Sequence, residues 1–102
     1  MLKLNKEKEF NYYINNINFS LIVIFYTNWC SFCYDLEKKI NKLILRNKKL
    51  KFLGIDAEKF PNLSNYYKIY SVPVIIFFHN GNEIKRKINS FDFDELNNFI
   101  TF

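Results

Sequence analysis

The 102-residue sequence predicts one α/β domain, spanning residues 1–102, with a central mixed β-sheet flanked by helices. Short apolar runs typical of covered strands alternate with segments whose apolar residues recur at helical spacing. Near the C-terminus an Asn-Gly pair joins two further strand-like runs, as in a tight hairpin. Hydrophobic residues make up 49% of the chain, enough for a domain of this size to bury its own core. The predicted element order is (β)αβαβαββα.

The N-terminal segment is predicted to contain a very short edge strand, an amphipathic helix and a central strand. The edge strand lies around Leu2 and Leu4, and Asn5 is the candidate N-cap of the helix. The apolar residues of this helix share one face: Phe10, Tyr13, Ile14 and Ile17. Residues 19–26 form a β-branched and aromatic run, which indicates a strand covered on both faces.

The middle of the chain is predicted to form two helices separated by a strand. From residue 33 to about residue 47, apolar side chains gather on one helix face: Leu36, Ile40, Leu43 and Ile44. Residues 50–56 form another buried strand, and residues 60–70 a short, irregular helix with Pro61 near its start. Because a helix connects successive strands, these strands are expected to pair in parallel.

The C-terminal segment is predicted to form a hairpin followed by a closing helix. Asn80 and Gly81 suit the positive φ angles of the turn within residues 72–88. Asp92 and Glu95 form a plausible capping box for the last helix. The apolar face of this helix consists of Phe93, Leu96, Phe99 and Ile100. Since the hairpin must be antiparallel, the sheet is expected to be mixed.

The two cysteines of the chain, Cys30 and Cys33, follow the strand at 19–26, where open sheets collect their chemistry. Three other roles would explain the cysteines: a structural disulfide, inert buried thiols, or a metal cluster shared between two chains. A disulfide that closes so small a loop adds little to the stability of the fold. A zinc site would need further ligands, and His79 is the only other soft candidate. Redox use is favoured because cysteines at i and i+3 on a first helical turn can bridge reversibly. The helix N-terminus favours a thiolate at Cys30, and Cys33 would resolve the mixed disulfide.

The chain resembles the thioredoxin family over nearly its whole length, through "FYTNWCSFC" and "VPVIIFFHNG". The resemblance implies a thioredoxin fold and a thiol–disulfide oxidoreductase in which Cys30 is the nucleophile and Cys33 the resolving thiol. It implies a cis bond before Pro73, beside the disulfide. The same resemblance places Trp29 next to the nucleophile and assigns to Val72 a hydrogen bond with an extended substrate backbone.

The sequence also departs from the family pattern. Ser31-Phe32 replaces the Gly-Pro of thioredoxins, and Phe32 is expected to be an exposed part of the docking surface. Ile24 stands where many relatives carry a buried acid, and Phe52 where a nearby lysine is found. The carboxylate of Glu37 is interpreted as a solvated helix charge.

The expected function is reduction of protein disulfides by a monomer that needs no metal or prosthetic group and receives electrons from a reductase or a small thiol. A thioredoxin-fold binding or assembly subunit with little turnover is the alternative. The net charge is +5, but the lysines are scattered along the chain, so no nucleic-acid partner is expected. A basic module that associates with nucleic acid is a second, more distant alternative. The apolar runs are too short to span a bilayer, so no membrane partner is expected. The expected compartment is the cytoplasm, or an organelle if a presequence was removed.

Overall fold

The computed structural model describes residues 1–15, 20–88 and 91–101. The elements follow the predicted order: β1 (Leu2–Lys3), α1 (Lys8–Ile14), β2 (Ser20–Tyr26), α2 (Ser31–Arg46), β3 (Lys51–Asp56), α3 (Pro61–Tyr66), β4 (Val74–His79), β5 (Asn82–Ile88) and α4 (Phe93–Phe99). Ile17, predicted to belong to the first helix, and Phe19, predicted to open the central strand, lie outside the described residues. None of the helices in the described ranges is long and apolar enough to cross a membrane.

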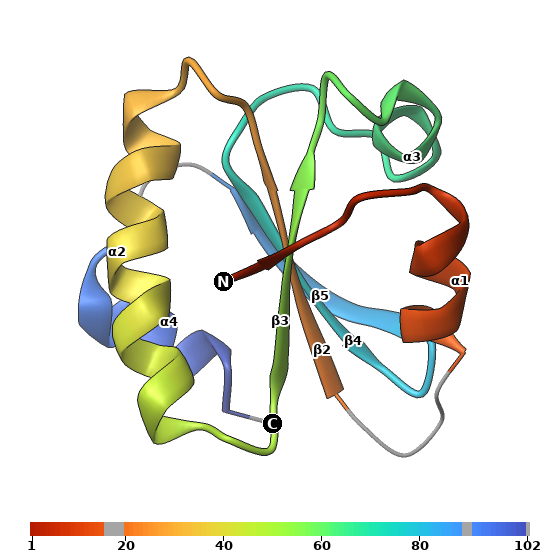
Figure 1. Ribbon diagram of the computed structural model, residues 1–102. Helices are drawn as coiled ribbons and strands as arrows, with labels where there is room; N and C mark the ends of the chain where they lie inside the picture. Colours follow the sequence, from red (N-terminus) through yellow and green to blue (C-terminus); the bar gives the residue numbers. More distant parts are fainter. Residues whose placement is uncertain (16–19, 89–90, 102) are drawn as a thin grey trace.

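The five strands form a mixed sheet in the order β1-β3-β2-β4-β5, with β2 at its centre. Strands β1, β3 and β2 are parallel, and β4 is antiparallel to both β2 and β5. Figure 1 shows α2 and α4 on one face of this sheet and α1 and α3 on the other. The sheet therefore separates two apolar cores, and β2, β3 and β4 contribute to both.

The direction of β4 differs from the parallel pairing expected for strands that a helix connects. Tyr26 and Asp56 pair at the end of β2 and β3, and Val74 begins β4 next to Phe25, at the same end of the sheet. The connection between β3 and β4, residues 57–73 with α3 inside it, leaves and re-enters the sheet at this same end. The carboxyl ends of β2 and β3 therefore meet the start of β4.

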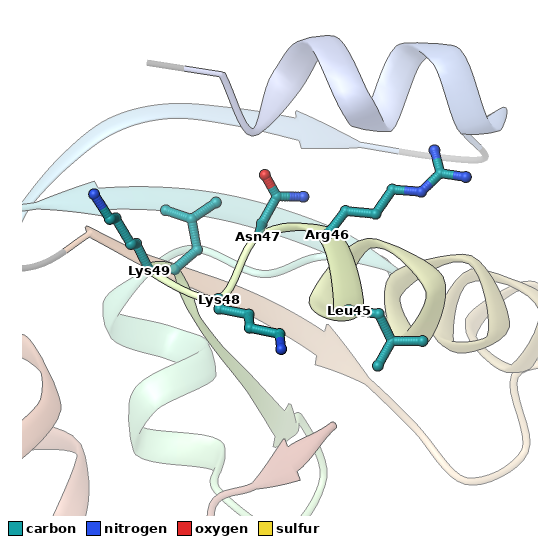
Figure 2. Close-up of a pocket in the computed structure, with 6 residues that line it drawn as sticks. Leu45, Arg46, Asn47, Lys48 and Lys49 are labelled. Carbon is teal, nitrogen blue, oxygen red and sulfur yellow. The ribbon is translucent and has the colours of Figure 1, made fainter.

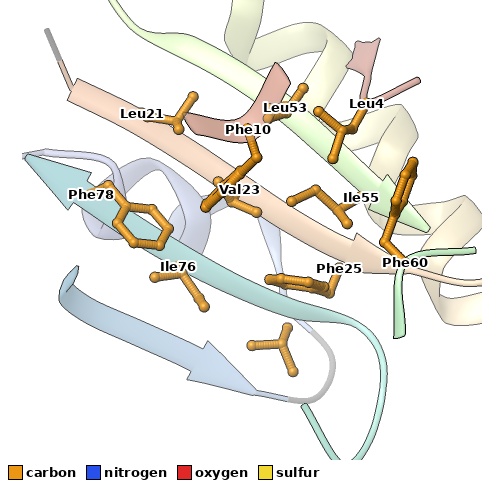
Figure 3. Packing of buried hydrophobic residues seen from close by; sticks show 11 residues of the cluster. Leu4, Phe10, Leu21, Val23, Phe25, Leu53, Ile55, Phe60, Ile76 and Phe78 are labelled. Atoms are coloured by element: carbon orange, nitrogen blue, oxygen red, sulfur yellow. The ribbon is translucent and has the colours of Figure 1, made fainter. Parts of the chain in front are cut away.

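The core beneath α1 and α3 is built from alternate residues of the central strands (Figure 3). Its buried members are Leu4, Phe10, Leu21, Val23, Phe25, Leu53, Ile55, Phe60, Val74, Ile76 and Phe78. On the opposite face the intervening residues of the same strands pack against α2 and α4. This alternation explains why the strands read as continuous apolar runs in the sequence.

The turn prediction and the N-cap half of the capping-box prediction are confirmed, and the third local prediction, the cap at Asn5, is wrong. Asn80 and Gly81 both have positive φ, 52° and 79°, in the β4–β5 turn. The side chain of Asp92 accepts a hydrogen bond from the backbone N–H of Glu95 at the start of α4, and this bond lowers the pKa of Asp92. Asn5 is not the cap of α1, because that helix begins only at Lys8.

The two edges of the sheet differ from its interior. At one edge β1 has two residues, both exposed. At the other, β5 carries three consecutive cationic residues at 85–87. Arg86 forms an ion pair with Glu83, and Lys87 with Glu95.

Candidate active site

A disulfide joins Cys30 and Cys33 at the N-terminus of α2, just beyond the end of β2. Cys30 is the N-cap residue, and its Sγ accepts a hydrogen bond of 3.1 Å from the backbone N–H of Cys33. The first N–H groups of a helix lack partners within the helix, so this sulfur satisfies one of them. The sulfur of Cys30 consequently lies at the positive end of a 16-residue helix.

Both cysteines are buried, with exposed fractions of 8% for Cys30 and 6% for Cys33. In the oxidised protein Cys30 is therefore the more exposed of the two by only a small margin. The order in which the reduced thiols react therefore stays a prediction.

The segment before β4 lies against the disulfide, as the family resemblance implied. The Val72–Pro73 peptide bond is cis, which confirms the expected geometry. The carbonyl oxygen of Val72 is 4.0 Å from Sγ of Cys30. Pro73 precedes the first residue of β4, where its missing N–H costs the sheet no hydrogen bond. The backbone at Val72 is thus close enough to the sulfur to contact whatever binds there.

Two large aromatic side chains beside the disulfide face solvent. Trp29 is 72% exposed and Phe32 is 63% exposed, so Phe32 does not fold back into the core. Tyr34, also exposed, was not among the predicted site residues, and the ammonium of Lys38 lies 4.7 Å from the centre of its ring. The end of α2 that carries the disulfide therefore presents an apolar rim.

The β3–α3 connection positions Trp29, a contact that the sequence did not reveal. The indole Nε1–H of Trp29 donates a hydrogen bond to Oε1 of Glu58 at 2.7 Å. Glu58 is held in turn by Asp56, whose Oδ1 accepts the backbone N–H groups of Glu58 and Lys59 at 3.0 and 3.2 Å. An Asp at the end of a strand predicts a turn from the sequence alone. Which residue that turn contacts, here Trp29, depends on how the chain folds.

A cavity of about 170 Å³ lies behind the disulfide, and Ile24, Thr27 and Cys33 are among its lining residues. Ile24 is almost fully buried, so an apolar side chain occupies the place where many relatives of the family carry an acid. The hydroxyl of Thr27 is buried and has no hydrogen-bond partner among the described residues. The cavity is large enough to hold water beside this hydroxyl.

The nearest charges lining this cavity come from the N-terminus of the chain and from α2. Nζ of Lys3 is 3.5 Å from Oε1 of Glu37, and Glu37 is half-buried rather than fully solvated as expected. Burial raises the pKa of the Tyr26 hydroxyl, and the negative charges of Asp56 and Glu37 raise it further. A lysine–carboxylate pair thus lies at the cavity although Ile24 and Phe52 occupy the positions named from the resemblance.

His79 does not join the two cysteines. It ends β4, at the opposite end of the sheet, and its Nδ1 is 2.9 Å from Oγ of Ser20. Within the described ranges, no three His, Cys, Asp or Glu side chains gather closely enough to hold a metal ion.

The thioredoxin family model matches residues 1–102. The chain is 33% identical over 86 residues to thioredoxin-1 of Drosophila yakuba, covering 82% of this chain and 80% of that protein. It is 28% identical over 90 residues to the mitochondrial thioredoxin-2 of Schizosaccharomyces pombe, covering 86% of this chain and 68% of that protein.

Solved structures agree in fold. The thioredoxin of Fasciola hepatica superposes with a TM-score of 0.90 at 22% identity, covering 99% of this chain and 97% of that one. The oxidised mitochondrial thioredoxin 3 of Saccharomyces cerevisiae gives 0.88 at 24% identity, covering 98% and 92%. At these identities the likeness shows the fold alone, whereas the family model covers the whole chain and includes the Cys-x-x-Cys segment. The chain belongs to the thioredoxin family and is a protein-disulfide oxidoreductase whose redox-active pair is Cys30 and Cys33.

Proposed function

We propose that the chain acts as a reductase of protein disulfides, with Cys30 as the nucleophile and Cys33 as the resolving thiol. The thiolate of Cys30 attacks one sulfur of the substrate disulfide, forms a mixed disulfide and expels the other sulfur as a thiolate. Cys33 then loses its proton and attacks Sγ of Cys30, which releases the second substrate thiolate. Both substrate thiolates take up protons from solvent, and two electrons have passed from the cysteine pair to the substrate.

The observation that carries this assignment is the hydrogen bond from the backbone N–H of Cys33 to Sγ of Cys30. A negative sulfur at Cys30 would keep this bond and would also interact favourably with the helix N-terminus. Cys33 lies inside the first turn, where its sulfur has no such donor among the described residues. Stabilising the thiolate of Cys30 rather than that of Cys33 makes Cys30 the attacking group.

The substrate-binding surface proposed here consists of Trp29, Phe32, Val72 and Pro73. The carbonyl of Val72 is an acceptor for an N–H of an extended peptide, a mode of recognition in which backbone hydrogen bonds supply affinity. The exposed rings of Trp29 and Phe32 would cover apolar side chains on either side of the target cysteine. Pro73 fixes the backbone next to this carbonyl.

The remaining features of the proposal follow from a two-electron cycle. The oxidised pair must be re-reduced by an external reductase or by a small thiol, because the chain supplies no further cysteine.

We place the protein in the cytoplasm as a monomer, with an organelle as the alternative compartment, since one of its relatives bears a mitochondrial name.

An insulin-reduction assay with dithiothreitol as electron donor tests the proposal. The wild type should accelerate precipitation of the insulin chains, and Cys30→Ser should abolish the acceleration. Cys33→Ser should instead accumulate a mixed disulfide with the substrate, detectable by mass spectrometry. If Cys33→Ser is inactive without a trapped adduct while Cys30→Ser traps one, the roles are reversed.

The alternative of a binding or assembly subunit rests on the apolar Ile24 behind the disulfide. It predicts that wild type and Cys30→Ser bind a partner equally and that neither reduces insulin above background.

The redox potential of the cysteine pair decides the direction of electron transfer. A value near the thioredoxin range, about −270 mV, supports a reductase, and a value near −120 mV supports an oxidase.

A further inference from the structure

The positive charge of the chain is concentrated in one segment. Residues 38–55 contain seven of its fifteen lysines and arginines and none of its ten acidic residues. The rest of the chain has eight basic and ten acidic residues and is therefore net negative, at −2, although the whole chain carries +5. The excess of positive charge thus belongs to the part of the chain from the middle of α2 to the start of β3.

Five of these seven cations lie at or near the end of α2 that is away from the disulfide: Lys42, Arg46, Lys48, Lys49 and Lys51. Figure 2 shows Arg46 extending from the last turn of the helix, and Lys48 and Lys49 from the connection that follows it. They line an open depression of about 500 Å³ together with Leu45, Asn47 and Leu50. We define the basic patch as the exposed residues Lys42, Leu45, Arg46, Lys48, Lys49 and Lys51.

The charges of the basic patch are not neutralised within the described part of the chain. The ion pairs found there involve Lys3, Arg86 and Lys87. Arg46 lies over the ring of Phe93, 5.3 Å from its centre, which leaves its charge in place. A carbonyl at the helix end is satisfied by Asn47, whose Nδ2 donates to the oxygen of Leu43 at 2.9 Å. The cations are therefore available to an external anionic surface.

Leu45 distinguishes the basic patch from a merely solvated helix end. Its side chain is 74% exposed and extends to the same side as Lys48 (Figure 2). An exposed leucine flanked by lysines matches the interface of a bilayer, where apolar groups enter the headgroup region and cations meet anionic lipids. Nucleic-acid binding would instead call for exposed aromatic rings for base stacking, and the one aromatic residue of this segment, Phe52, is buried.

We propose that the basic patch binds the surface of an anionic membrane reversibly. The absence of a spanning segment, on which the expectation of no membrane partner rested, does not bear on surface binding. The sixteen residues of α2 separate the basic patch from the disulfide by about 24 Å. A molecule held through the basic patch keeps the disulfide end turned away from the lipid, towards substrates near the membrane.

Co-sedimentation with sucrose-loaded vesicles tests this proposal. The wild-type protein should bind vesicles of phosphatidylcholine with 30% phosphatidylserine, should not bind pure phosphatidylcholine, and should dissociate as salt is raised. Each cation near such a surface contributes roughly fivefold to binding, so Lys48→Gln/Lys49→Gln should weaken it about 25-fold. Leu45→Ser should weaken binding as well, without changing its dependence on salt.

The matched control is Lys6→Gln/Lys8→Gln, which removes the same charge from exposed lysines at the other face of the sheet. It should bind anionic vesicles within twofold of wild type. Circular dichroism verifies that each variant is folded, and Lys42→Gln/Lys51→Gln replaces any that is not. Equal losses in the control and patch variants would overturn the proposal, as would no binding to anionic vesicles. Tighter binding of a 20-nucleotide oligothymidine than of vesicles at equal salt would overturn it in favour of nucleic acid.

Discussion

Replacing Phe32 with alanine should separate recognition of proteins from the chemistry of the disulfide. An aromatic side chain presents roughly 150–250 Å² of surface, and 63% of Phe32 is exposed, so a bound protein can cover roughly 100 Å² or more. At about 25 cal/mol per Å² this area is worth about 2.5 kcal/mol if fully covered, and about 1.3 kcal/mol if half covered. We therefore expect kcat/KM for a protein disulfide to fall about tenfold.

The rates of reduction of two substrates, a protein disulfide and a small disulfide, are compared in Phe32→Ala and in one control variant. A small aromatic disulfide meets only the sulfur of Cys30, so its rate of reduction should change less than twofold in Phe32→Ala. Tyr12→Ala removes an even more exposed ring, at 73%, from α1 on the other face of the sheet, and should leave both rates unchanged. If Phe32→Ala lowers both rates equally, or lowers neither, the ring is not part of the docking surface.

Three further changes test other parts of the structure. Ile24→Asp places a carboxyl in the cavity behind Cys33 at a cost of several kcal/mol in stability, and stopped-flow measurement should show faster resolution of the mixed disulfide. An unchanged rate in the folded variant would show that the missing acid does not limit this protein. Gly81→Ala should lower the free energy of unfolding by about 2 kcal/mol, or roughly 10 °C in Tm. The reason is that φ of residue 81 is 79° and the new Cβ would lie 2.8 Å from the carbonyl oxygen of Ile14. An unaltered Tm would contradict this. Burial raises the pKa of Tyr67 to about 12, so stability present below pH 10 should be lost as pH rises through 12, by about 1 kcal/mol after allowance for solvent screening. Urea denaturation between pH 9 and 12 should show a smaller loss for Tyr67→Phe, and equal losses would assign the effect to other groups.

The features predicted correctly depend on neighbours in the sequence. The turn at Asn80 and Gly81 and the cap of α4 at Asp92 follow from backbone preferences within a few residues. The central strands β2, β3 and β4 follow from their largely apolar runs. The positions of Cys30 and Cys33 follow from their spacing at the start of a helix.

The features that were missed depend on contacts between distant segments. The hydrogen bond between Glu58 and Trp29 joins residues that are 29 positions apart, and the ion pair of Lys3 and Glu37 joins β1 to α2. No local sequence pattern predicts either contact. The antiparallel direction of β4 depends on the end of the sheet at which the connection through α3 re-enters it, and the helix pattern in the sequence does not show this.

The basic patch illustrates a different difficulty. In the sequence its cations are interrupted by leucine, isoleucine and asparagine, and they look scattered when a continuous run is sought. The helix places Lys42 and Arg46 four residues apart with the buried Leu43 between them, and the turn after the helix adds Lys48 and Lys49. Counting acids as well as bases over a longer window would have revealed the segment.

The edges of the sheet have a consequence for how chains meet at high concentration. An exposed strand edge is a template on which another chain can add a strand, the step that begins fibril growth. Here β1 offers only two residues, too few for a stable pairing. On the other side, β5 carries four charged residues, Glu83, Lys85, Arg86 and Lys87, and two of its cations are held in ion pairs with Glu83 and Glu95. Both edges therefore disfavour the edge-to-edge addition of a strand from a second molecule, one because it is short and the other because it is charged.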